Sequence, residues 1–138
     1  MSKYKNAQTI ILTGGDTLAP NIMSSASSLV STSRSFADFV LACTFNVSVV
    51  AGKSVHLYRR DKSIVGANDA PVPTLTSYEH KYVGSFPIQL GTSIQYIPLN
   101  GVAIPNACEF YLKQDSGETM STGYLLHMTP WDWAPPTA

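Results

Sequence analysis

The amino-acid sequence predicts an all-β protein, a two-sheet β-sandwich that is jelly-roll-like. Apolar and polar residues alternate with a period of two in several short segments, and no segment keeps a helical period. Turn-forming residues separate these segments at regular intervals, so about six to eight short strands are expected. With 138 residues the chain fits a single domain spanning 1–138, large enough to bury one ordinary core.

The first expected elements lie before residue 36. The run TIILT at 9–13 is a short strand, since apolar residues follow one another between polar ones. The segment after Pro20 contains seven serines between positions 24 and 35. Serine hydroxyls compete for the backbone hydrogen bonds of a helix, so we expect a loop here, with one short helix as the alternative.

The longest alternating segment is FADFVLACTFNVSVVAG at 36–52, which predicts a half-buried strand. Six apolar residues share one face of it: Phe39, Leu41, Cys43, Phe45, Val47 and Val49. A turn at 51–54 leads to the alternating run VHLYRR at 55–60. We expect these two strands to form a hairpin.

The region 61–80 is rich in Pro, Gly, Asn and Asp and is expected to be a long exposed loop. Two strands follow it, in KYVGSFPIQL at 81–90 and in TSIQYIPLNGVAIP at 92–105. Each contains a proline, Pro87 or Pro98. Because proline has no N–H for the ladder, both strands are predicted to lie at sheet edges or to contain bulges.

Two further turns are predicted in the last third of the chain. Asn100-Gly101 lies between apolar runs, a pattern typical of a tight turn. The run CEFYLK then alternates from Cys108 onward, with its apolar residues on one face. A turn at 114–117 and a return strand from Tyr124 make this the second expected hairpin.

The charge balance excludes several kinds of partner. The chain carries 9 basic and 9 acidic residues, and only 13% of its residues are charged, against about 25% in an average soluble domain. Arg59-Arg60 is the only adjacent basic pair and is followed by Asp61, which argues against nucleic-acid binding. No apolar run has the length of a signal peptide or a membrane span, so we expect synthesis in the cytoplasm and no membrane partner.

The sequence contains two cysteines and three histidines that could take part in disulfide or metal chemistry. Cys43 and Cys108 could form a disulfide between strands, but a cytoplasmic chain favours two reduced, buried thiols. His56, His80 and His127 lie far apart, without a second ligand at a metal-binding spacing. We therefore expect no metal site and no cofactor.

The sequence contains no recognisable catalytic motif. It has no G-x-S-x-G elbow for a serine nucleophile. Glycoside cleavage needs two carboxylates about 5 to 10 Å apart. Glu109, Asp115 and Glu118 are the candidates, clustered on one predicted hairpin. Glu109 lies on a polar strand face and the other two flank a turn, which is typical of solvated acids. We therefore predict no catalytic residue and no enzymatic activity.

The last eleven residues, MTPWDWAPPTA, contain both tryptophans. In an extended tail the two indoles would face the same side, and prolines would stiffen the tail at both ends. We predict a C-terminal arm at about 130–138 and an N-terminal segment at about 1–12 that contact neighbouring proteins, because Trp and Tyr are enriched at interface hot spots. The alternative is that both indoles fold back on their own domain. The expected contact residues are Pro130, Trp131, Trp133, Pro135, Pro136, Lys3, Tyr4 and Lys5.

The run from Lys53 to Pro130 resembles the small jelly-roll cement or decoration proteins in the virions of tailed bacteriophages. The similar parts are AGKSVHLYRRD, KYVGSFPIQL, VAIPNACEFYLKQDSG and TGYLLHMTP, together with the proline-rich loop. The resemblance implies a non-enzymatic protein on the capsid surface that binds the major capsid protein and its own copies. A homo-oligomer, dimer or trimer, is then expected, and the resemblance assigns no functional residue.

Two alternatives remain open at this point. A tail or receptor-binding component of the same virion would share the fold and the compartment. A carbohydrate-binding β-sandwich module would use Trp131 and Trp133, with Tyr58 or Tyr124, as a stacking surface for sugars. The carbohydrate alternative predicts soluble monomers and a loss of glycan binding when Trp131 is replaced by Ala.

Overall fold

A computed structural model of the protein describes residues 3–62, 74 and 81–133 and confirms the all-β prediction. Within these ranges the chain forms strands and turns and no helix. The strands are β1 (Lys3–Lys5), β2 (Thr9–Thr13), β3 (Val30–Ser31), β4 (Phe36–Cys43), β5 (Ser54–Asp61), β6 (Lys81–Pro87), β7 (Gln95–Ala103), β8 (Ala107–Asp115) and β9 (Leu125–Trp133).

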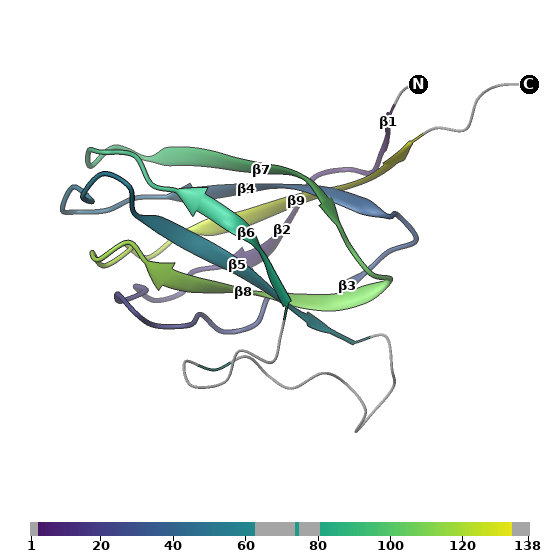
Figure 1. The fold of residues 1–138 in the computed structure, drawn as a ribbon, viewed down its shortest axis with the longest axis horizontal. Helices are drawn as coiled ribbons and strands as arrows, with labels where there is room; N and C mark the ends of the chain where they lie inside the picture. The colour runs from purple at the N-terminus through teal and green to yellow at the C-terminus, as the bar shows by residue number, and fades with distance from the viewer. Residues whose placement is uncertain (1–2, 63–73, 75–80, 134–138) are drawn as a thin grey trace, which may run out of the picture.

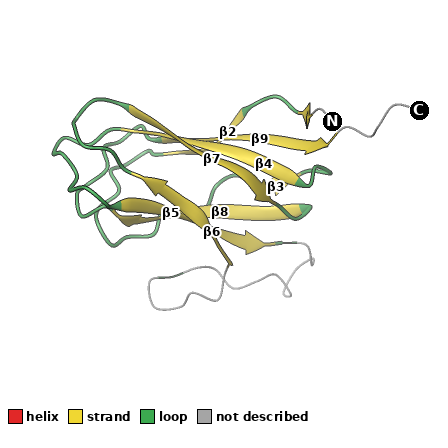
Figure 2. Cartoon of the chain, turned by 45° about the horizontal axis from the view of Figure 1, so that its top comes forward, coloured by secondary structure: helices red, strands yellow, loops and turns green. Residues whose placement is uncertain are grey.

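The strands form two antiparallel sheets that lie face to face (Figures 1 and 2). One sheet has the order β1-β9-β4-β7, with β2 also paired to β9, and the other has the order β3-β8-β5-β6. Without the short β1, the order β2-β9-β4-β7 opposite β3-β8-β5-β6 is the strand order of a jelly roll. The predicted two-sheet sandwich is therefore confirmed.

Both hairpins predicted from the sequence are wrong. β4 and β5 lie in different sheets, and so do β8 and β9. The turns at 51–54 and 114–117 reverse the chain, but in each case the chain crosses to the facing sheet instead of pairing with the preceding strand. A period of two and a turn signal describe both arrangements equally well, because each strand has one buried face in either case.

The long strand predicted at 36–52 is also shorter than expected. β4 ends at Cys43, and the chain beyond it leaves the sheet. Phe45 and Val49 still enter the core, whereas Val47, which the alternation places with them, is 58% exposed. The alternating pattern continues through the connection to β5 although the strand does not.

The core consists of the inward faces of the two sheets. The largest fully buried side chains include Phe39 of β4 and Phe110 of β8, whose rings meet edge to face at 4.9 Å between centroids. Cys43 and Cys108 are free and buried, as predicted. Burial raises the pKa of the Cys43 thiol to about 11 and that of the Cys108 thiol to about 12.

The serine-rich segment runs along the outer edge of β8 and forms no helix. The hydroxyls of Ser24 and Ser27 accept hydrogen bonds from the backbone N–H groups of Leu112 and Phe110, each at 2.9 Å. The backbone N–H groups of the same two serines donate to the carbonyls of Leu112 and Phe110. Serine hydroxyls thus provide the hydrogen-bond acceptors that a neighbouring strand would supply from its backbone carbonyls. In this way the edge of β8 is hydrogen-bonded without a further regular strand.

The proline prediction for Pro87 and Pro98 is confirmed, because β6 and β7 are edge strands of their sheets. The turn predicted at Asn100-Gly101 is wrong, since both residues lie inside β7 opposite the single residue Asp38. This is a β-bulge in which Gly101 has a φ of 70° and donates its N–H to Asp38 Oδ1 at 2.9 Å.

Candidate interaction surface at the chain termini

The two ends of the described chain lie side by side on one sheet. β1 pairs with the end of β9, with Lys3 opposite Trp133 and Lys5 opposite Trp131. Figure 1 shows both ends leaving the sandwich at the same place. We call β1 together with residues 130–133 the terminal ribbon. It contains six of the predicted contact residues, whereas Pro135 and Pro136 lie outside the described residues.

Trp131 is fixed to its own domain. Its side chain is 4% exposed and stacks on Phe36, with 4.7 Å between ring centroids and 21° between planes. Its indole Nε1–H donates to Asp38 Oδ1 at 3.0 Å. The ammonium of Lys3 lies 4.2 Å from the centre of the Trp131 ring and 3.6 Å from Asp38 Oδ2. These contacts occupy both the apolar and the polar parts of the indole.

Trp133 and Tyr4 are the exposed aromatic residues of the ribbon, at 48% and 55%. Trp133 meets Trp131 edge to face, with 5.1 Å between centroids and 84° between planes, so the two indoles share a side as predicted. Tyr4 pairs with Asp132 in the ladder, and the Arg34 guanidinium lies 4.7 Å from its ring centre. The buried Trp131 thereby supports an exposed Trp133 in a defined orientation.

The described residues of the two predicted contact segments are partly built into the fold, whereas residues 1–2 and 134–138 lie outside the described residues. Pro130 and Trp131 are buried parts of β9, because the indole finds apolar and polar partners on β4. The Pro130 carbonyl accepts a hydrogen bond from the Asn6 N–H at 2.9 Å, in the gap between β1 and β2. The N–H that proline lacks would therefore face this gap and not a paired strand. In the predicted N-terminal segment 1–12, Ile11 and Leu12 are each 6% exposed and belong to the core.

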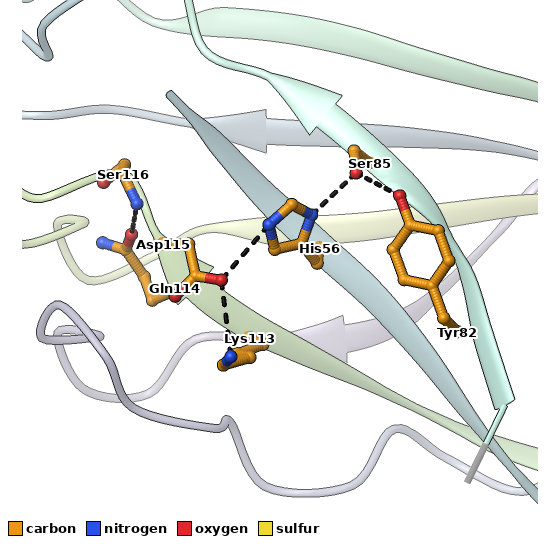
Figure 3. Close-up of polar contacts among 7 residues, drawn as sticks. All are labelled: His56, Tyr82, Ser85, Lys113, Gln114, Asp115 and Ser116. Carbon is orange, nitrogen blue, oxygen red and sulfur yellow. Dashed lines mark hydrogen bonds and ion pairs between the residues drawn. The ribbon is translucent and has the colours of Figure 1, made fainter. Parts of the chain in front are cut away.

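A polar network missed by the sequence analysis lies on the outer face of the other sheet (Figure 3). His56 Nδ1 lies 2.7 Å from Ser85 Oγ, and His56 Nε2 lies 3.2 Å from Asp115 Oδ2. Tyr82 Oη also bonds Ser85 Oγ, and Lys113 Nζ lies 3.5 Å from Asp115 Oδ2. Strand register brings these residues together: His56 pairs with Ser85 on β6, and Ser54, two residues before it on the same face of β5, pairs with Asp115 on β8. Only sheet topology could have revealed this.

The network contains Ser, His and Asp, the residue types of acyl-transfer enzymes, but its geometry favours a structural role. Acyl transfer needs a serine Oγ free to attack and donors around the developing oxyanion. Here Ser85 Oγ is shared between His56 and Tyr82. Neither Ser85 nor His56 lines the groove between β6 and β7 or the groove between β2 and β3. The network joins the edge strand β6 to β5 and β8.

Glu109 lies too far from Asp115 to form a catalytic pair with it. Glu109 and Asp115 lie on the same strand, six residues apart and so about 20 Å from each other at the rise of a β-strand. A two-carboxylate glycosidase needs about 5 to 10 Å. Glu109 contacts Arg60 and Lys62, each at 3.4 Å, at the opposite end of β8 from Asp115. The absence of catalytic residues stays a prediction.

Across residues 3–62, 74 and 81–133, no three His, Cys, Asp or Glu side chains gather closely enough to hold a metal ion. The same part of the chain has no helix with the length and apolar character needed to cross a membrane. No protein-family model, curated protein or solved structure matches the chain.

Proposed function

We propose that the protein is a non-enzymatic structural protein of a virion, a cement protein that binds the major capsid protein and its own copies. The observation that carries this proposal is the terminal ribbon. It presents Trp133 and Tyr4 to solvent on a support fixed by Trp131, next to the place where both described chain ends leave the domain. In this proposal the ribbon contacts the capsid protein, and the particle surface is the site of action.

Three features of the ribbon suit a protein contact. Trp and Tyr are enriched among residues that dominate binding energy, especially when they are held rigidly before binding. Lys5 adds a positive charge on an exposed strand. β1 also has three exposed residues, and among the described strands none pairs with its outer edge, which a neighbouring strand could extend.

The jelly roll and the low charge are consistent with this role. A protein that stays bound to a shell needs little charge on the surface that it buries, because lasting interfaces are more apolar than transient ones. Stabilisation of the shell would follow from mass action. A ligand that binds only the assembled lattice favours the closed state, by about 2.7 kcal/mol at one hundred times its dissociation constant.

The carbohydrate-binding alternative has less support. Sugar stacking needs an exposed aromatic face, whereas Trp131 is 4% and Tyr124 is 6% exposed. The two indoles are also nearly perpendicular, at 84°, and form no flat platform. A tail or receptor-binding component of the same virion remains the second proposal, since it would use the same exposed ribbon.

The test is binding of the purified chain to capsids of the virus that encodes it, after those capsids have been stripped of the chain. We expect saturable binding and a higher dissociation temperature of the shell. Trp133→Ala should weaken binding about tenfold, since truncation of a hot-spot residue costs more than about 1 kcal/mol. Thr122→Ala, in an exposed turn far from the ribbon, is the matched control.

Truncations should begin at Ala134, because removal of residues from Pro130 onward would also remove the buried Trp131. Wild-type protein that does not bind these capsids would reject the proposed function. Binding that Trp133→Ala leaves unchanged would reject the ribbon as the contact and keep the wider proposal. Binding to isolated tails and not to capsids would favour the tail component.

A further inference from the structure

The end of the sandwich opposite the chain termini contains two connections almost without charge. Residues 39–52 and 82–108 contain no Asp, Glu, Lys, Arg or His. In the fold they include most of the β4–β5 connection and the whole β6–β7 connection, which lie together at the left of Figure 1. Lys53, just before β5, is the one charged residue in the two connections.

Large apolar side chains are exposed on both connections. Val47 and Val50 are 58% and 66% exposed, and Leu90 and Ile94 are 66% and 56% exposed. We call these four residues the loop-end patch. Tyr96, at the start of the edge strand β7, lies two residues beyond Ile94 and is 67% exposed. Exposed apolar residues are common singly, but several on adjoining loops mark an interaction surface.

Hydrogen bonds hold the two loops together. The Gly91 N–H donates to Ser48 Oγ at 2.9 Å, which joins the stretch containing Val47 and Val50 to the one containing Leu90. The Gln95 side chain closes the second loop on itself, accepting the Gln89 N–H and donating to the Gln89 carbonyl, each at 2.9 Å. Beneath them, Val49 and Ile88 are buried. The patch is therefore ordered before any partner binds, which lowers the entropy cost of binding.

We propose that the loop-end patch is a contact between two copies of this chain, related by a twofold axis. A charged partner would lose hydration at this surface without gaining an opposite charge, so the patch fits an apolar and neutral surface. Each copy of the chain carries one such surface. Two identical neutral patches meet without the like-charge repulsion that a charged patch would suffer in a symmetric dimer.

This inference deepens the proposed function, because it assigns the surface for contacts between copies. Only its role within a shell rests on that function. The self-contact itself is a property of the isolated chain and is tested without capsids. A lipid surface is the other candidate for apolar loops, but interfacial anchors usually carry several basic residues beside their apolar ones. Here Lys53 is the single basic residue within the two connections.

The first experiment is sedimentation equilibrium of the full chain over about 10 to 200 µM, a range suited to micromolar self-association. We expect the mass to rise from one chain of 14.9 kDa toward two. The double variant Val50→Ser/Leu90→Ser should weaken the dimer at least about tenfold. Tyr4→Ser, at a similarly exposed position on the opposite end, should leave it unchanged. Far-ultraviolet circular dichroism confirms that each variant is folded.

The second experiment places a thiol in the patch. Cys43 and Cys108 are buried, so Leu90→Cys adds the one accessible thiol on the described part of the chain. Mild oxidation should give a disulfide-linked dimer, whereas the control Tyr4→Cys, at an exposed position on the opposite end of the sandwich, should give only background. Urea-induced unfolding of the product and of the unmodified chain then shows whether the linked copies are native.

Several results would overturn the inference. Wild-type protein that stays monomeric over the whole range would do so, as would a dimer that Val50→Ser/Leu90→Ser leaves intact. A monomer that sediments with neutral phosphatidylcholine vesicles through the same residues would assign the patch to lipid. Loss of self-association with capsid binding retained would reject only this inference. A patch-dependent dimer that fails to bind capsids would reject the proposed function instead.

Discussion

Trp131 at the terminal end and the loop-end patch at the other end differ in whether the domain itself covers their apolar side chains. At the terminal end, Trp131 is covered by Phe36, Asp38 and Lys3 of the same chain. At the loop end, Val50 and Leu90 are each 66% exposed. The comparison shows that a large apolar residue in the sequence indicates a binding partner only if the fold leaves its side chain exposed.

The two connections that carry the patch also differ in charge from the strands at the terminal end. Ion pairs at the terminal end connect Lys3 with Asp38, Arg59 with Asp61, and Arg60 with Glu109. The β4–β5 and β6–β7 connections at the other end have Lys53 as their one charged residue. The terminal end can thus support electrostatic recognition of a different protein, whereas the neutral patch favours contact with an identical surface.

The largest effect is expected for Trp131→Ala. Removal of a buried indole should lower the free energy of unfolding by about 3 to 5 kcal/mol, measured by urea denaturation. Trp133→Ala, two residues away and 48% exposed, should cost less than about 1 kcal/mol. Equal losses for the two variants would contradict the difference in burial between these neighbours.

Asp38→Ala should have the next largest effect. Asp38 Oδ1 accepts hydrogen bonds from the Gly101 N–H and the Trp131 Nε1–H, so its loss leaves two donors without this acceptor. We expect a loss of about 1 to 3 kcal/mol, with a smaller loss for Asp38→Asn, which retains an acceptor oxygen. If Asp38→Ala were as stable as wild type, the bulge in β7 would not depend on this side chain.

The thiols should respond to pH through the stability of the fold. Burial raises the pKa of Cys43 to about 11 and of Cys108 to about 12, whereas an unfolded thiol titrates near 9. Above that pH the unfolded chain loses protons that the folded chain keeps, so stability should fall as pH rises from about 9. At pH 8 both thiols should react with a thiol reagent only after unfolding. Fast labelling of the native protein would contradict their burial.

The smallest effect on stability is expected at the loop end. Val50→Ser and Leu90→Ser should each change the free energy of unfolding of the monomer by less than about 0.5 kcal/mol, because neither side chain is buried. The same variants should weaken self-association, so stability and association separate. A large loss of monomer stability would mean that the patch packs against its own chain.

The sequence predicts the strands better than their partners. Alternation located β5 and β8 closely, and Pro87 and Pro98 correctly predicted edge strands. It could not distinguish a hairpin from a crossing to the other sheet, because both leave one apolar face per strand. Asn100-Gly101 was predicted as a turn but forms a bulge, because a glycine with positive φ suits a tight turn and a β-bulge equally well.

The candidate sites were predicted less well. The sequence identified the terminal residues as unusual, but Trp131 is covered by residues at positions 3, 36 and 38, far away in the chain. The network around His56 depends on strand register, which local patterns do not contain. The alternating pattern did not reveal the loop-end patch. Val47 continues the alternation of β4, but the strand has already ended at Cys43 and the side chain of Val47 is exposed.

Hydrogen–deuterium exchange at low and high protein concentration tests the contrast between the two ends most directly. We predict that the amides of β9 near Trp131 are protected at both concentrations, because the fold itself covers them. The amides of the β4–β5 and β6–β7 connections should become protected only at high concentration, as two copies meet. Exchange that slows with concentration in the terminal ribbon and not in these loops would contradict the account.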